Sequence, residues 1–126
     1  MHIVAILRVR DGLLSLQDNL LRITEERETE HFEEKASSLT KIVIRDIDEA
    51  LEILEASPDH ARAVGILKKI RSSLPRRVKQ FVRLAKAKKW QSLRGEVGEN
   101  LQEAVRSIET NALPEGRMPP PKRPLR

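Results

Sequence analysis

Carboxylates and histidines at short spacing are the first residues that could do chemistry. Glu28 and His31 form a Glu-x-x-His motif, and in ferritin-like bundles such a motif supplies two di-iron ligands from one helix face. A complete site also needs a second motif of this kind, but the residue three positions before His60 is Ser57. We therefore predict no metal centre and expect His31 to be an ordinary solvated histidine.

His60 raises the question of phosphotransfer, because some four-helix bundles carry a phosphorylated histidine in mid-helix. Their usual surroundings are His-x-Leu-Lys-Gly, whereas this chain continues from His60 as Ala-Arg-Ala-Val. No Ser/His/Asp or Cys/His set and no glycine-rich phosphate loop is present. The chain has no cysteine, which excludes disulfide scaffolds and thiolate metal sites. We predict a protein that is not an enzyme and that uses no cofactor.

A basic stretch offers binding chemistry instead. Residues 61–95 contain twelve basic residues and no acidic one. Apolar residues recur among them at steps of three and four, as on one face of a helix. The opposite, outward positions carry six cations, of which four repeat every seventh residue. These six are our candidate binding residues: Arg62, Lys69, Arg76, Lys79, Arg83 and Lys86.

Two interpretations of these cations stay open. The net charge of +5 and the pI near 9.9 favour a nucleic acid or an anionic lipid as partner. However, residues 25–60 carry twelve acidic and only four basic residues, so we expect the acidic face of the second helix to lie beside the third. The chain has only two Phe, one Trp and no Tyr, so few aromatic rings are available for stacking on nucleic-acid bases. Nucleic-acid binding would then be non-specific and strongly salt-dependent.

Four helical segments must position these residues. The scarcity of aromatic residues favours helices over a β-sandwich or barrel. Apolar seams predict helices over residues 3–27, from about 29 to 54, from 58 through a kink at Pro75 to a turn near 87–89, and onward to 112. We predict an all-α, antiparallel up-down-up-down four-helix bundle over residues 1–113. A disordered, proline-rich basic tail is expected over residues 114–126.

The boundaries differ in the strength of their signals. Ser57, Pro58 and Asp59 supply an N-cap, a first-turn proline and a first-turn acid, so the third helix should begin at Pro58. Asp11 and Gly12 could break or delay the first helix. Whether the chain turns near residue 29 or continues straight stays open, since no capping box supports a boundary there.

The two ends of the chain carry weaker patterns. The apolar start at residues 3–9 is far shorter than the roughly 20 residues that span a bilayer, and it lacks the order of a signal peptide. We expect a soluble chain that is not exported, in an undetermined compartment. The end contains Pro-x-x-Pro-x-Arg, a form taken by some ligands of SH3-type grooves, but a plain basic tail is the simpler interpretation.

One stretch resembles a known family. Residues 83–94 run Arg-Leu-Ala-Lys-Ala-Lys-Lys-Trp-Gln-Ser-Leu-Arg. This is similar to the turn into the last helix of the four-helix-bundle sensor modules of bacterial transmembrane receptors, both chemoreceptors and sensor kinases. Those modules often have Leu-Ala-x-Ala-Gly-Asp-Trp-x-x-Leu/Val-Arg, whereas Lys88 and Lys89 stand here in place of Gly-Asp. Residues 13–27 and 46–54 fit the first two helices, so the resemblance covers about residues 9–112.

The resemblance implies a helical module that passes a small helix displacement to a partner and that dimerises. Such modules lie between two membrane spans, which this sequence does not show, so an extracytoplasmic location follows only if the chain is a receptor fragment. Our leading hypothesis is a non-enzymatic signalling or protein-interaction module. Its partner would be another protein or a second copy of the chain, with nucleic acid or anionic lipid as secondary partners. The alternative is a small basic protein that binds nucleic acid non-specifically through the same cations.

Overall fold

The computed structural model describes residues 2–113, and within them the chain is helical without strands. The predicted tail over residues 114–126 lies outside the described residues. A short 3₁₀ turn, η1 (Pro58–His60), precedes the third long helix, and a π-helical turn, η2 (Ile108–Ala112), extends the fourth. The long helices are α1 (His2–Thr24), α2 (Thr29–Leu54), α3 (Ala61–Lys86) and α4 (Trp90–Ser107).

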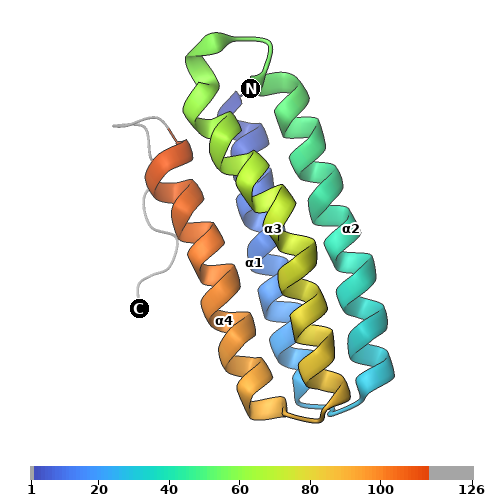
Figure 1. Ribbon diagram of the computed structural model, residues 1–126. Helices are drawn as coiled ribbons and strands as arrows, with labels where there is room; N and C mark the ends of the chain where they lie inside the picture. Colours follow the sequence, from blue (N-terminus) through green and yellow to red (C-terminus); the bar gives the residue numbers. More distant parts are fainter. Residues whose placement is uncertain (1, 114–126) are drawn as a thin grey trace.

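The four helices form an antiparallel bundle, which confirms the predicted fold class. Figure 1 shows successive helices running in opposite directions, joined by short turns at the two ends. Contacts join α1 to α2, α2 to α3, α3 to α4 and α4 back to α1. The helices therefore form a closed ring in which α1 faces α3, and α2 faces α4, across the core. This arrangement leaves α3 with α2 on one side and α4 on the other.

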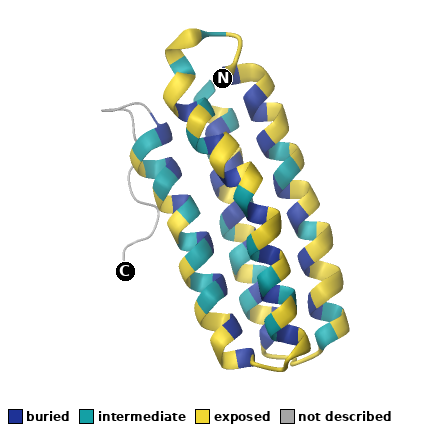
Figure 2. Cartoon of the chain, viewed as in Figure 1, coloured by how far each residue is buried: buried dark blue, intermediate teal, exposed yellow. Residues whose placement is uncertain are grey.

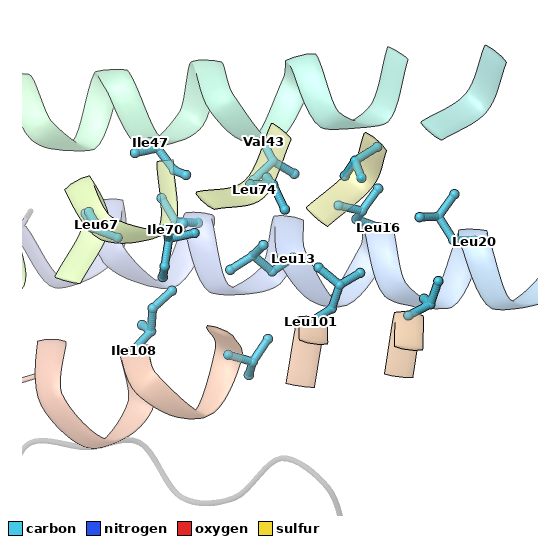
Figure 3. Packing of buried hydrophobic residues seen from close by; sticks show 14 of the residues in the cluster. Leu13, Leu16, Leu20, Val43, Ile47, Leu67, Ile70, Leu74, Leu101 and Ile108 are labelled. Carbon is cyan, nitrogen blue, oxygen red and sulfur yellow. The ribbon is translucent and has the colours of Figure 1, made fainter. Parts of the chain in front are cut away.

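The core is built from the predicted apolar seams. Figure 3 shows leucine, isoleucine and valine side chains from all four helices meeting along the bundle axis. Along these seams Leu39 and Ala104 are half-buried at the edge of the core, whereas their neighbours Thr40 and Val105 are buried. At 3.6 residues per turn, a seam drifts relative to a strict seven-residue repeat, so neighbouring positions exchange burial along a long helix.

Helix α1 runs without interruption through Asp11 and Gly12, so the break considered from the sequence does not occur. A Cβ atom at Gly12 would lie 3.5 Å from the Asp46 carboxylate and 3.6 Å from the Val43 side chain. The glycine therefore marks a close approach of α1 to α2. The apolar start of the chain belongs to α1, where Ile6 and Val9 are buried. Within residues 2–113 no helix combines the length and apolarity that a membrane span requires.

The turn near residue 29 is real, so α1 and α2 are separate helices. Residues 25–28 reverse the chain, with Arg27 in the left-handed region at a φ of 54°. As expected, no capping box is present, because Glu28 makes no side-chain cap hydrogen bond. The Thr29 hydroxyl instead donates to the Ala85 carbonyl at 3.1 Å. This hydrogen bond ties the start of α2 to the end of α3.

The start of α3 differs slightly from the prediction. The Ser57 hydroxyl accepts from the Asp59 N–H at 3.3 Å, as an N-cap should, but Pro58 begins the 3₁₀ turn η1. The α-helix itself starts at Ala61, three residues later than predicted. Pro75 lies inside α3, which continues past it. The alternative of a hairpin at Pro75 is therefore excluded.

The turn from α3 to α4 separates Trp90 from the basic residues of α3, although Trp90 falls on the same seven-residue repeat as Arg62, Lys69, Arg76 and Arg83. Because α3 ends at Lys86, the repeat is broken and Trp90 starts α4 with only 8% of its surface exposed. Its ring packs edge to face against Phe32, with 6.5 Å between ring centroids. Trp90 is therefore a core residue at this end of the bundle.

Candidate functional site

Three cations on the α2 side of α3 are paired with acids of α2 or of its C-terminal end. This confirms the prediction that the acidic face of the second helix lies beside the third. Figure 1 shows these two helices side by side over most of their length. Three ion pairs cross between them: Lys68 with Glu55 at 3.0 Å, Arg71 with Asp48 at 2.6 Å, and Lys86 with Glu33 at 3.7 Å.

The pair of Arg71 and Asp48 has the strongest geometry of the three. The Arg71 guanidinium donates from Nε to Oδ1 at 2.6 Å and from Nη2 to Oδ2 at 3.1 Å, a two-pronged contact. The hydrogen bonds from Arg71, aided by its charge, lower the pKa of Asp48 below its usual 3.8, and the same contacts raise the pKa of Arg71. Both side chains are close to half exposed, so salt in the solvent screens this interaction.

Two further basic residues of the stretch 61–95 have structural partners. Arg77 donates to the Asn100 side-chain oxygen at 2.6 Å and thereby joins α3 to α4. Arg94, at the start of α4, donates to the Leu21 carbonyl at 3.0 Å and to the Thr24 hydroxyl at 2.9 Å. Arginine side chains that bind the last carbonyls of a helix stabilise its C-terminal end, so Arg94 serves the fold by capping α1.

The remaining cations of α3 point away from the bundle. Figure 2 shows that the outward faces of the helices are largely exposed. We call Arg62, Lys69, Arg76 and Arg83 the outer row. All four, and Lys79 beside them, are exposed, and within residues 2–113 none of the five forms an ion pair. Arg83 donates only to the uncharged Gln80 side chain at 3.0 Å. Of the six candidate binding residues, Lys86 is the one that already has an acidic partner.

The spacing of the outer row is regular. Residues seven apart on an α-helix lie about 10.5 Å apart along its axis, so the four charges extend over about 30 Å. They lie on the face of α3 opposite its buried residues, because the core positions follow a seven-residue repeat of their own through Leu67, Leu74 and Phe81. The outer row is thus a regularly spaced row of like charge that turns gradually around α3, because seven residues fall slightly short of two full turns.

Among residues 2–113, no exposed large apolar or aromatic side chain accompanies the outer row. Both Phe and the single Trp of the chain are buried, and the chain has no Tyr. The exposed large hydrophobic residues within the described part of the chain are Val4, Ile42 and Ile53, which belong to α1 and α2. The outer row therefore presents charge alone, without rings for base stacking.

The histidines do not assemble a site. The His31 ring nitrogen Nδ1 lies 2.6 Å from a carboxylate oxygen of Glu26, which is not the glutamate of the sequence motif. No group of three residues that could hold a metal ion occurs in the part of the chain that the structure describes. The His60 ring lies beside the His2 ring, with 4.2 Å between centroids, at one end of the bundle.

Two features were not expected from the sequence. Arg10 is buried on α1, where it donates to Asp11 at 3.0 Å and contacts Glu109 of η2 at 3.5 Å. A groove also opens between α2 and α3 beside Lys79. Periodicity identifies which face of each helix is apolar, but it does not tell how closely two helices pack. The groove could therefore not be predicted from the sequence. The one local indication is Ser37, whose short side chain lines the groove.

In comparisons with models of protein families, with curated proteins and with solved structures, no match to this chain was found.

Proposed function

We propose that this protein is a non-enzymatic interaction module whose outer row binds an acidic surface of a protein partner. The observation that carries the proposal is the division of the α3 cations. Arg77, which faces α4, and three of the cations that face α2 are engaged by side chains or carbonyls of the bundle, whereas the outer row and Lys79 have no ion pair within the described residues. The four cations of the outer row, with Lys79 beside them, gain stability when an external anion neutralises them.

The regular spacing favours a helical partner. A second helix aligned with α3 presents its own residues at about 10.5 Å intervals when acids recur every seventh position. Such a helix can pair with all four members of the outer row at once. Charge pairs of this kind, at the outward flanks of packed helices, determine partner choice and orientation in coiled coils. The proposed interaction is therefore selective through its charge pattern.

Other anionic partners fit the surface less well. Single-stranded nucleic acids bind strongly where bases stack on aromatic rings, and every Phe and Trp ring is buried here. Helices that bind membranes lay an apolar face into the lipid, whereas the exposed large apolar residues among residues 2–113 lie on α1 and α2. These comparisons support a protein partner, with non-specific nucleic-acid binding as the alternative that the experiment must test.

A signalling role is the second part of the proposal. The resemblance of residues 83–94 to the receptor sensor modules supports it, and so does the architecture. Ion pairs and hydrogen bonds connect α3 to α2 and α4. A partner helix that binds along α3 and shifts it therefore also acts on these two neighbours. Binding can thus be transmitted to the neighbouring helices as a small displacement, which is the action that the resemblance implies.

The direct test uses two synthetic helical peptides of equal composition. In one, glutamates recur every seventh residue on an otherwise alanine-rich, uncharged face; in the other, the same glutamates are scrambled. We expect the regular peptide to bind at least about tenfold more tightly by fluorescence anisotropy, since matching the row adds the equivalent of two or three favourable ion pairs. The affinity should fall as salt is added, because the charges are exposed.

Matched variants locate the binding surface. Arg76→Glu combined with Arg83→Glu should abolish binding of the regular peptide. The control, Lys35→Glu combined with Arg106→Glu, changes the net charge equally at exposed positions on α2 and α4, and it should bind nearly normally. Equal loss in both variants would contradict the proposal. Tighter binding of a DNA duplex than of the regular peptide, lost with the row variant, would favour the nucleic-acid alternative.

A further inference from the structure

The groove between α2 and α3 lies midway along the two helices and has a volume of about 550 Å³. This size falls in the range of known ligand pockets. Its apolar lining comes from both helices, and Thr40 adds a hydroxyl. The residues that form this surface are Thr40 and Ile44 of α2 with Pro75, Val78 and Val82 of α3.

The ion pairs between α2 and α3 do not extend over the groove. The acids at its rim, Glu33 and Asp48, are already bound by Lys86 and Arg71. Three rim cations, Lys41 and Arg45 from α2 and Lys79 from α3, have no ion pair within residues 2–113. Like charges therefore line both sides of an apolar groove, although acids and bases alternate across the same helix pair elsewhere.

A buried polar atom below the groove also has no partner among residues 2–113. The Thr40 side chain lines the groove with 8% of its surface exposed, but its hydroxyl oxygen is buried beneath that surface and makes no hydrogen bond. A buried, unpaired hydroxyl is unfavourable in a finished core, where such groups are normally satisfied. An amphipathic, acidic partner would neutralise the unpaired cations with its acids and cover the apolar surface with its apolar side chains. Both features are therefore expected of a groove that binds such a partner.

We infer that this groove docks the apolar face of an acidic amphipathic helix from the protein partner. This inference rests on the proposed function. It adds the site at which the apolar side chains of the partner bind. Lys79 lies three residues after Arg76 and four before Arg83, so all three are neighbours on the surface of α3. The groove is thus continuous with the outer row.

One helix can use both surfaces together. When it lies along the boundary between α2 and α3, large apolar residues on one face enter the groove near Val78 and Val82. Acids flanking that face then meet Lys41 and Arg45 on one side and Lys79 with the outer row on the other. Helix-in-groove recognition of this kind places its anchors at intervals of three and four residues.

The test compares two peptides that differ only in the apolar anchors. The first is the regular glutamate peptide with alanine on the face toward the groove; the second carries leucines there at positions i and i+4. We expect the leucine peptide to bind about tenfold more tightly, because an open groove removes only part of the leucine surface from water. Backbone amide shifts in ¹⁵N spectra should change around Ser37, Ile44 and Val82 only with the leucine peptide.

A blocking variant provides the matched control. Ser37→Trp places a large side chain in the groove from an exposed position, whereas Ser38→Trp places the same side chain at the adjacent exposed residue outside it. We expect Ser37→Trp to remove the advantage of leucine over alanine, and Ser38→Trp to retain it. Helical circular dichroism of both variants should match the parent, because neither position belongs to the core.

The outcomes separate this inference from the proposed function. If both peptides bind equally well and neither shifts the groove amides, the groove site is overturned while the outer row stands. If neither peptide binds, both proposals fail. If the parent chain dimerises without peptide and Ser37→Trp makes it monomeric, the groove belongs to a second copy of the chain, and the inference of an acidic helix is overturned.

Discussion

Single residues in this bundle show where local conformation and the sequence disagree. Lys88 adopts a φ of 59°, in the left-handed region that favours glycine. Its N–H donates to the Ala85 carbonyl and the Lys89 N–H donates to the Leu84 carbonyl, the two hydrogen bonds of a Schellman motif. The end of α3 thus has the geometry of a glycine-terminated helix without the glycine.

Lys88→Gly should therefore stabilise the protein by about 1 kcal/mol, because glycine adopts positive φ without the steric cost that a Cβ atom imposes. Urea unfolding followed by circular dichroism measures this change. Lys89→Gly is the matched control: its φ is −94°, so glycine there should be neutral or destabilising. A destabilising Lys88→Gly would show that the lysine side chain makes a contact worth more than the backbone strain.

Thr40 offers a second test at the residue scale. Since its buried hydroxyl has no hydrogen-bond partner, Thr40→Val should raise the free energy of unfolding by about 1 kcal/mol. Thr24→Val should have the opposite effect, because the Thr24 hydroxyl donates to the Leu21 carbonyl and accepts from Arg94. Both changes are measurable by thermal unfolding. Destabilisation by Thr40→Val would mean that this hydroxyl is satisfied in solution.

At the scale of helices, the periodicity of apolar residues was enough to predict four helices and their antiparallel order. The seam of α1 through Leu13, Leu16 and Leu20 is buried as predicted. Boundaries were less predictable, because they depend on tertiary contacts. The Thr29 hydroxyl bonds to a carbonyl of another helix, and no local capping pattern could reveal that partner.

The ion pair between α2 and α3 makes a prediction about pH. Because the Asp48 pKa is lowered in the folded protein by hydrogen bonds from Arg71, its contribution to stability is complete above the usual value of 3.8. It is lost as the pH falls through the lowered pKa. Asp48→Asn should therefore lower the melting temperature at pH 7, and this difference from the parent should shrink to nothing in strong acid.

The control for that prediction is Glu52→Gln, at an exposed acid of α2 that forms no ion pair within residues 2–113. Its melting temperature should follow that of the parent across the pH range. A melting-temperature difference for Asp48→Asn that persists unchanged as the pH falls through the lowered pKa of Asp48 would contradict the electrostatic explanation.

At the scale of the whole molecule, segregated charge organises the surface. The sequence predicted that acids of α2 lie beside α3 and neutralise part of its positive charge, and the three ion pairs confirm this. Which cations stay unpaired could not be predicted, because pairing depends on the rotation of α3 relative to its neighbours. Lys86, expected to be outward and available, faces Glu33, whereas Lys79 has no such partner in the described part of the chain.

The groove could not be predicted for a related reason. Sequence periodicity identifies the apolar face of each helix, but the space between two helices depends on how closely they pack, and here Ser37 and Val82 both line that space. The charge segregation, the order of the helices and the core could therefore be predicted from the sequence. The groove and its rim cations could not, because they depend on how α2 and α3 are arranged in space.

A charge-swap experiment tests whether the outer row recognises regularly spaced acids. The protein with Arg76→Glu and Arg83→Glu is titrated with the regular peptide after the two glutamates that face positions 76 and 83 are replaced by lysines, and anisotropy reports binding. We predict that the swap restores at least half of the binding free energy lost with the glutamate peptide, while the scrambled lysine peptide does not. Failure of the regular lysine peptide to bind better than the scrambled one would contradict this recognition.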